Sequence, residues 1–420
     1  MTPQSFKGPI LFIACHRLLY ILQRLLAPIL RFIPPLKQRY QFELRNLADP
    51  LAKAWGHDQV VEWAFHCSSE GEFEQLKPLI QHCLDSKLKI EVIFTSPSVE
   101  RRVSALAKDY PAQVRLLRLS LLLNLSLGSW SRAKNLMMCR YDFFPELLLL
   151  PVKRRVLAWA SLKGKRPGWW SQGVFQQFDL IISSNKEQFE CFREFVAEEK
   201  LDLYDFRPAQ IFSRLQAAKH ETALTQALNL TEPSQRIVLG SVWESDLFLF
   251  EQLIKSPGKI HFWLAPHALD HTSIENLKLE WTQRYPYCEV VVFGEGQPSP
   301  SAEKVAWLVT KPGRLLELYG QFNLAYVGGG FGRSIHSVLE PVLAGCWSVC
   351  GPRTHRSTEI DLANELSPNQ VKVVITAHDF YQWWREHHEL ENCLKDDNRI
   401  RTIHNWIEQS AQVIRRCLVN

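Results

Sequence analysis

Residues 326–341 read YVGGGFGRSIHSVLEP, and this stretch decides the fold class. An apolar strand ends here in glycines, and we expect a helix to follow with His336, Ser337 and Glu340 near its first turn. Glycine lets backbone amides approach a phosphate, and a helix N-terminus favours an anion. The spacing is neither a Walker A loop nor G-x-G-x-x-G, which argues against ATP hydrolysis and NAD chemistry. The stretch predicts a nucleotide site on a parallel sheet, with a merely tight glycine turn as the alternative.

On both sides of this stretch, short apolar runs alternate with helix-length amphipathic segments, as is typical of parallel sheets covered by helices. In the first half we expect strands at 60–66, 89–95, 156–160 and 178–183, and helices starting near 71, 98 and 144. In the second half we expect strands at 236–240, 259–266, 289–293, 305–309, 324–328 and 347–351, and helices within 377–418. The expected fold is therefore α/β, with two doubly wound, Rossmann-like domains.

The polar stretch 213–235 ends in Thr-Glu-Pro-Ser and predicts a domain junction. We expect an N-terminal helix in 1–40, a first Rossmann-like domain in 41–225 and a second in 226–420. The net charge of +5 suits acidic partners such as nucleotides or anionic lipid without choosing between them. The ten cysteines form no C-x-x-C pair, which indicates a reducing compartment and no zinc site.

The N-terminal segment 10–33 is rich in Leu and Ile, but Arg17, Arg24 and Arg31 recur in it every seven residues. On a helix these arginines form one stripe, and the rest of the circumference is apolar. The pattern predicts an amphipathic helix lying in a membrane surface, with the arginines towards lipid phosphate. An ordinary helix packed on its own domain is the alternative. The arginines interrupt the apolar stretch, which argues against a secretory signal.

A further stretch, HCSSEGEF at 66–73, follows a strand and precedes a helix. Glu72 is thereby placed at the carboxyl end of a strand, where open α/β sheets bind ligands. A carboxylate at the start of a helix is also an ordinary capping group. The residues alone leave both readings open.

Seven motifs in order along residues 60–362 resemble the transferases of 3-deoxy-D-manno-octulosonic acid (Kdo), which are glycosyltransferases of the GT-B type. The matching segments are 66–72 with 78–80, 95–98, 140–144, 240–246, 265–267, 310–319 and 328–341, followed by 351–352 and 359–360. Val242, Ser334 and Ser337 depart from the family pattern, and the Gly-Asp-x-Arg element expected near the domain junction is reduced to residues 205–207. The resemblance implies two domains facing a central cleft, with the donor bound by the second.

The resemblance further implies inverting transfer of Kdo from CMP-Kdo to a lipid A precursor, at the cytoplasmic face of a bacterial inner membrane. Glu72 would be the general base, supported by Asp142. The implied donor-binding residues are Ser241, Pro266, His267, Gly313, Arg314, Gly329, Gly330, His336, Ser337 and Glu340. No metal, cofactor or nucleic-acid partner is expected. A non-catalytic descendant that binds sugar nucleotide or lipid, and an enzyme like the sugar-nucleotide 2-epimerases, remain as alternatives.

Overall fold

The computed structural model describes residues 10–53, 59–122, 130–140, 142–162, 168–217, 222–299, 301–354, 359–393 and 397–418. The chain divides into two compact units. The first unit comprises 1–207 with 409–420, and the second comprises 208–408. The division thus falls ahead of the junction expected at 225, and the end of the last helix belongs with the first unit.

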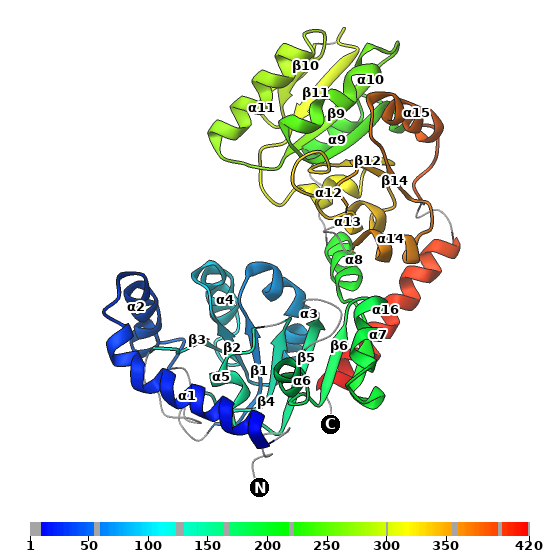
Figure 1. The fold of residues 1–420 in the computed structure, drawn as a ribbon. Coiled ribbons are helices and arrows are strands. Elements are labelled where there is room, and N and C mark those ends of the chain that lie inside the picture. Colours follow the sequence, from blue (N-terminus) through cyan, green and yellow to red (C-terminus); the bar gives the residue numbers. More distant parts are fainter. Residues whose placement is uncertain are drawn as a thin grey trace. The chain divides into compact units, whose positions relative to one another are not determined.

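The first unit is built on a seven-stranded parallel sheet with strand order β3-β2-β1-β4-β5-β6-β7 (Figure 1). Its strands are β1 (Val61–Cys67), β2 (Ile90–Phe94), β3 (Val114–Arg118), β4 (Ala133–Cys139), β5 (Arg154–Ala160), β6 (Leu180–Ser183) and β7 (Leu201–Leu203). Its helices are α1 (Ile10–Leu30), α2 (Pro34–Ala48), α3 (Glu70–Asp85), α4 (Pro97–Asp109), α5 (Pro145–Leu148), α6 (Trp169–Phe175) and α7 (Lys186–Arg193). The strand order reverses between β1 and β4, which is the switch point where such sheets bind ligands.

The second unit contains another seven-stranded parallel sheet, with strand order β10-β11-β9-β8-β12-β13-β14. Its strands are β8 (Arg236–Val242), β9 (Ile260–Pro266), β10 (Glu289–Val292), β11 (Lys304–Leu308), β12 (Leu324–Val327), β13 (Trp347–Cys350) and β14 (Val371–Val373). Its helices are α8 (Arg207–Ala217), α9 (Thr222–Leu228), α10 (Glu251–Lys255), α11 (His271–Arg284), α12 (Leu315–Tyr319), α13 (Leu339–Leu343), α14 (Glu359–Leu366), α15 (Ala377–His387) and α16 (Asp397–Leu418), whose end returns to the first unit. Here the strand order reverses between β8 and β12.

The strands form because near-continuous apolar runs can be buried on both faces of a parallel sheet. Every residue of β9 is buried, as is every residue of β2. The expected α/β fold with two doubly wound sheets is confirmed, and each expected strand is present within a few residues. β3, β4, β7 and β14 were not predicted, since charged residues interrupt them or they span only three residues.

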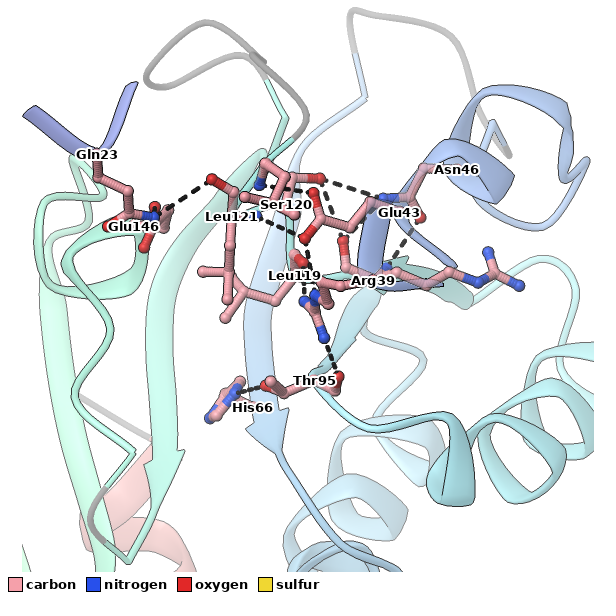
Figure 2. Close-up of polar contacts among 12 residues, drawn as sticks. Gln23, Arg39, Glu43, Asn46, His66, Thr95, Leu119, Ser120, Leu121 and Glu146 are labelled. Atoms are coloured by element: carbon pink, nitrogen blue, oxygen red, sulfur yellow. Dashed lines mark hydrogen bonds and ion pairs between the residues drawn. The ribbon is translucent and has the colours of Figure 1, made fainter. Parts of the chain in front are cut away.

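The second N-terminal helix, α2, is fastened to the first unit by buried polar contacts, which Figure 2 shows. Arg39 donates to the backbone carbonyls of Thr95 and Leu119, which directly follow β2 and β3, and forms a 2.7 Å ion pair with Glu43. Glu43 is completely buried and accepts a 3.0 Å hydrogen bond from the amide of Leu121. These contacts make α2 a part of the first unit.

Over residues 14, 15 and 17–30, the first helix, α1, buries a narrow strip of its surface and exposes most of the remainder. Tyr20 and Ala27 are buried, and Gln23 donates to the carboxylate of Glu146 in α5. Large apolar side chains cover the outer face: Leu18, Leu19, Ile21, Leu22, Leu25, Leu26 and Ile29, continued by Phe32 and Ile33. A helix packed on its own domain would normally bury such residues, so α1 has the reverse of the usual polarity.

The arginine stripe lies differently from the expectation that all three side chains point to lipid phosphate. Arg17 is exposed, but Arg24 and Arg31 are half-buried. Arg24 donates to the Tyr20 hydroxyl at 2.9 Å, because residues three and four apart share one face of a helix. Among the described residues no single helix has the length and apolarity to cross a membrane. One sharply bent pair, Arg17–Leu30 with Pro34–Ala48, meets those criteria jointly.

Candidate functional site

Three aromatic rings gather at the switch point of the second sheet, where β9, β8 and β12 end side by side. The ring of Trp243, directly after β8, stacks on that of His267, directly after β9, with centroids 4.2 Å apart and planes 19° apart. His267 in turn lies 4.4 Å from the ring of His336. We call these three rings the aromatic stack. It brings together two of the predicted donor-binding residues, His267 and His336.

Both imidazoles of the aromatic stack are neutral near pH 7. Burial, with a smaller contribution from the neighbouring His267, lowers the pKa of His336 to about 4. Burial also lowers the pKa of His267. Taking charge out of water disfavours the protonated form of a histidine. The stack therefore offers a nucleotide flat surfaces and hydrogen bonds but no positive charge.

The glycines after β12 serve the packing of the chain itself. Gly329 has a φ of 92°, which favours glycine, and its amide donates to the Asp246 carboxylate at 3.1 Å. A Cβ on Gly330 would lie 2.6 Å from the Cα of Gly351. Gly329 and Gly330 therefore form a tightly packed turn, which was the alternative to a phosphate-binding loop. The Gly329 amide already donates to a carboxylate of the chain.

The helix expected to begin at His336 begins later. α13 starts at Leu339, so His336 and Ser337 precede it. The amides of Val338 and Leu339 donate to a carboxylate oxygen of Glu359, at 3.1 and 3.4 Å. This corrects the expectation of an open helix N-terminus, because an internal carboxylate takes the place where an anion would bind.

Other predicted donor residues lie at the same edge of the sheet or just behind it. Burial raises the pKa of Glu340, whose carboxylate is 3.3 Å from the Arg214 guanidinium. Arg314, at the loop after β11, pairs with Glu317 at 2.7 Å. Gly313 has a φ of 80° and open space where a Cβ would stand. Glu340 and Arg314 are therefore both held by partners of opposite charge.

Backbone strain marks the switch points of both sheets. Ser241, near the end of β8, has a φ of 53°, and the register between β8 and β9 shifts beside it, where Pro266 ends β9. Arg140, directly after β4 in the first sheet, has a φ of 63°. Left-handed conformations cost free energy for residues other than glycine and concentrate at functional sites.

The predicted base, Glu72, stands in the first turn of α3, after β1. Its carboxylate accepts a 2.7 Å hydrogen bond from the Ser68 amide, and its own amide donates to the Ser69 hydroxyl at 3.3 Å. Burial raises the pKa of Glu72, the nearby Asp142 carboxylate raises it further, and these effects oppose the hydrogen bond from Ser68. Glu72 thus lies in the capped first turn of α3 and also has a raised pKa, and the second predicted acid, Asp142, is nearby.

Asp142 follows β4 across the switch point from Glu72 and is half-buried; Tyr141 of the same motif lies outside the described residues. His66, at the end of β1, is fully buried and lies 2.8 Å from the Thr95 hydroxyl through its Nε2. Burial lowers the pKa of His66 to about 3. A neutral buried imidazole of this kind supports the sheet edge.

A cavity of about 390 Å³ opens at the opposite edge of the second sheet, next to the first residues of β8 and β9. Lys259, Tyr381, Trp384, Arg385 and His388 contribute to its lining. No predicted site residue lies there. The cavity and the aromatic stack are thus separated by the length of the strands.

Sequence reasoning gave no role to Trp243, Asp246 or Glu359. Asp246 is completely buried and holds the Trp243 amide at 3.0 Å as well as that of Gly329. One signal was present: an acid three residues after Trp243 at a strand end is the spacing of a capping box. The partnership of Glu359 with α13 is long-range and leaves no such local signal.

No protein-family model matches the chain, and no protein of curated function matches its sequence. Solved structures do match it. The UDP-N-acetylglucosamine 2-epimerase of Neisseria meningitidis, bound to UDP-GlcNAc, gives a TM-score of 0.50 at 12% identity over 84% of this chain and 100% of that chain. MurG of Acinetobacter baumannii gives a TM-score of 0.49 at 9% identity, covering 84% and 99%.

The C-terminal CMP-Kdo binding domain of WaaA from Acinetobacter baumannii matches 48% of this chain and 98% of its own, at 19% identity and a TM-score of 0.34. At such identities a structural likeness concerns the fold and not the reaction. The two doubly wound sheets and the epimerase neighbour together show an α/β fold of the GT-B type.

Proposed function

We propose that the protein is a sugar-nucleotide-dependent glycosyltransferase that moves Kdo from CMP-Kdo to a lipid A precursor. One observation carries the proposal. Segments 240–246, 265–267, 310–319 and 328–341 are distant in sequence, resemble donor-site motifs of Kdo transferases, and follow the neighbouring strands β8, β9, β11 and β12. Their meeting at one sheet edge is what a nucleotide site requires.

Glu72 is the general base in this proposal. A hydroxyl is a weak nucleophile at neutral pH, and a positioned carboxylate raises the rate by roughly 10²- to 10⁴-fold. A raised pKa makes Glu72 a stronger base, and the Ser68 amide fixes its orientation. The negative charge that develops on the leaving CMP would be met by hydrogen-bond donors of the second unit. Because burial lowers the pKa of His267 and of His336, these residues would contribute to the site as neutral hydrogen-bonding groups.

The exposed apolar face of α1 supports action at a membrane surface. Leu22, Leu25 and Ile29 lie on this face and are 44%, 67% and 65% exposed. Lipid acyl chains would cover them, while the contacts of α2 attach the N-terminal helices to the first unit. Replacing these three residues by Gln should release the full chain from anionic vesicles in sedimentation, and replacing the exposed Leu279 of α11 by Gln serves as the control. Unchanged sedimentation of the triple variant would exclude this face as the contact.

The reaction itself is tested by mass spectrometry of detergent-dispersed lipid A precursor incubated with the protein and CMP-Kdo. We expect a product heavier by one Kdo residue or more, with CMP released. An unchanged acceptor together with tight CMP-Kdo binding would point to the non-catalytic alternative. Conversion of UDP-GlcNAc to its 2-epimer in a parallel incubation would point to the epimerase-like one.

A further inference from the structure

We propose that Trp243 is a positioning residue, which fixes His336 as a neutral imidazole with its proton on Nδ1. The Nδ1–H group then donates a hydrogen bond to an oxygen of the bound nucleotide. The identity of that ligand rests on the proposed function, whereas the position of the proton does not.

The geometry determines where the proton resides. The indole nitrogen of Trp243 lies 3.3 Å from Nε2 of His336. An indole N–H can only donate, so Nε2 must be the unprotonated nitrogen and Nδ1 must carry the hydrogen. Within the described residues Nδ1 has no hydrogen-bond partner, yet it is not among the atoms cut off from solvent. A donor is therefore presented at the switch point, and the described residues contain no acceptor that receives it.

The rest of the aromatic stack holds this arrangement in place. The ring of His267 lies against both Trp243 and His336, and the His336 amide donates to the Gly328 carbonyl at 3.2 Å. Asp246 accepts from the Trp243 amide and so fixes the start of the turn. Each ring is thus constrained by stacking and each neighbouring backbone segment by a hydrogen bond. A preorganised donor spends little ordering entropy when the ligand binds.

A second tryptophan–histidine pair in the same unit gives the opposite proton position and serves as an internal reference. The Trp307 indole nitrogen is 3.1 Å from Nδ1 of His261, and both side chains are buried in the core. By the same reasoning, the proton of His261 must be on Nε2. The two histidines should therefore be opposite tautomers in one molecule.

Nitrogen NMR of the full chain labelled with ¹⁵N-histidine tests the position of the proton on His336. We expect the unprotonated nitrogen of His336 to be Nε2 and that of His261 to be Nδ1. Trp243→Phe keeps a ring for stacking but removes the indole N–H, and should mix the tautomers of His336 while leaving His261 unchanged. A proton on Nε2 of His336 in the parent protein would overturn the proposal.

Titration with CMP tests the hydrogen bond from His336 to the nucleotide. Trp243→Phe should weaken CMP binding about fivefold, the size of one hydrogen bond. Asparagine at position 336 carries an amide nitrogen near the place of Nδ1 and needs no tautomer control. In a His336→Asn background Trp243→Phe should therefore cost almost nothing, whereas an equal loss in both backgrounds would show that Trp243 acts by packing alone. A parent protein that binds no CMP would refute the proposed function, and the NMR result would still decide the tautomer.

Discussion

Each unit places a carboxylate shortly after its first strand, and the two carboxylates have different surroundings. Glu72 follows β1, accepts one amide hydrogen bond from Ser68 and lies beside a second acid. Asp246 follows β8, is completely buried and accepts from two amides, those of Trp243 and Gly329. Burial raises the pKa of both. Asp246 at this position holds a turn together, whereas Glu72 at the equivalent position is the base in the reaction proposed above.

The largest effect is expected from Asp246→Ala, which leaves two buried amides without an acceptor. Each unsatisfied buried group costs about 1 to 3 kcal/mol, so the loss of both hydrogen bonds should lower the free energy of unfolding of the second unit by about 2 to 6 kcal/mol. CMP binding should be lost as well. Urea unfolding, followed by the fluorescence of the many tryptophans, measures this. A variant as stable as the parent would mean that Asp246 does not hold the turn.

Glu72→Gln should reduce turnover by about 100-fold or more, since an amide cannot accept the proton of the acceptor hydroxyl. CMP affinity should remain. Because its pKa is raised, the acid limb of the rate profile should lie above the ordinary range of a glutamate, and activity should fall as the pH drops through that limb.

A matched control for Glu72→Gln is Glu70→Gln, because Glu70 lies in the same turn of α3. Its side chain is half exposed and lies 3.8 Å from Arg102. This substitution should leave turnover unchanged. Equal rates for the two variants would remove Glu72 from the chemistry and reduce it to a helix cap.

Glu146 is a third buried carboxyl group, and burial raises its pKa to about 7. Ionisation therefore opposes folding, and stability is lost as the pH rises from the ordinary value near 4.5 through 7. Glu146→Gln keeps an oxygen for Gln23 but cannot ionise. It should raise the free energy of unfolding by about 2 to 3 kcal/mol at pH 8 and by almost nothing at pH 4.5. A gain independent of pH would contradict this.

The smallest effect is expected from Glu340→Ala, which should weaken CMP binding by about 1 to 3 kcal/mol if the carboxylate contacts nucleotide hydroxyls. Arg214→Gln removes the ion-pair partner of Glu340 but not the carboxylate. Calorimetry of both variants separates the roles. An equal loss in the two would assign Glu340 to holding α8 and not to the ligand.

The sheets could be predicted from sequence because most strands are apolar runs. Strand β3 was missed because it contains charged residues. Arg115 within it is buried and forms a 2.8 Å ion pair with Glu91 of β2. Arg118 is likewise buried and pairs with Asp49 and Glu100. Charged residues enter a sheet only where partners from distant segments meet them, and a single sequence does not display those partners.

Some residues of the candidate site could likewise be predicted from the sequence, and others could not. His267 and His336 were predicted from motifs at strand ends, and the structure brings them into one stack. The role of Trp243 depends on a hydrogen bond to a residue 93 positions later in the chain, which no local pattern encodes. The outward apolar face of α1 was visible as a periodic pattern, but the contacts of Arg24 with Tyr20 in the same helix and of Arg31 with Tyr40 of α2 were not predicted.

A crystal structure with CMP would decide between the two edges of the second sheet. We expect the nucleotide beside the aromatic stack, at the carboxyl ends of β8, β9 and β12, with one of its oxygens within hydrogen-bonding distance of Nδ1 of His336. CMP in the cavity near Trp384 and Arg385, at the amino ends of β8 and β9, would contradict the assignment of the donor site.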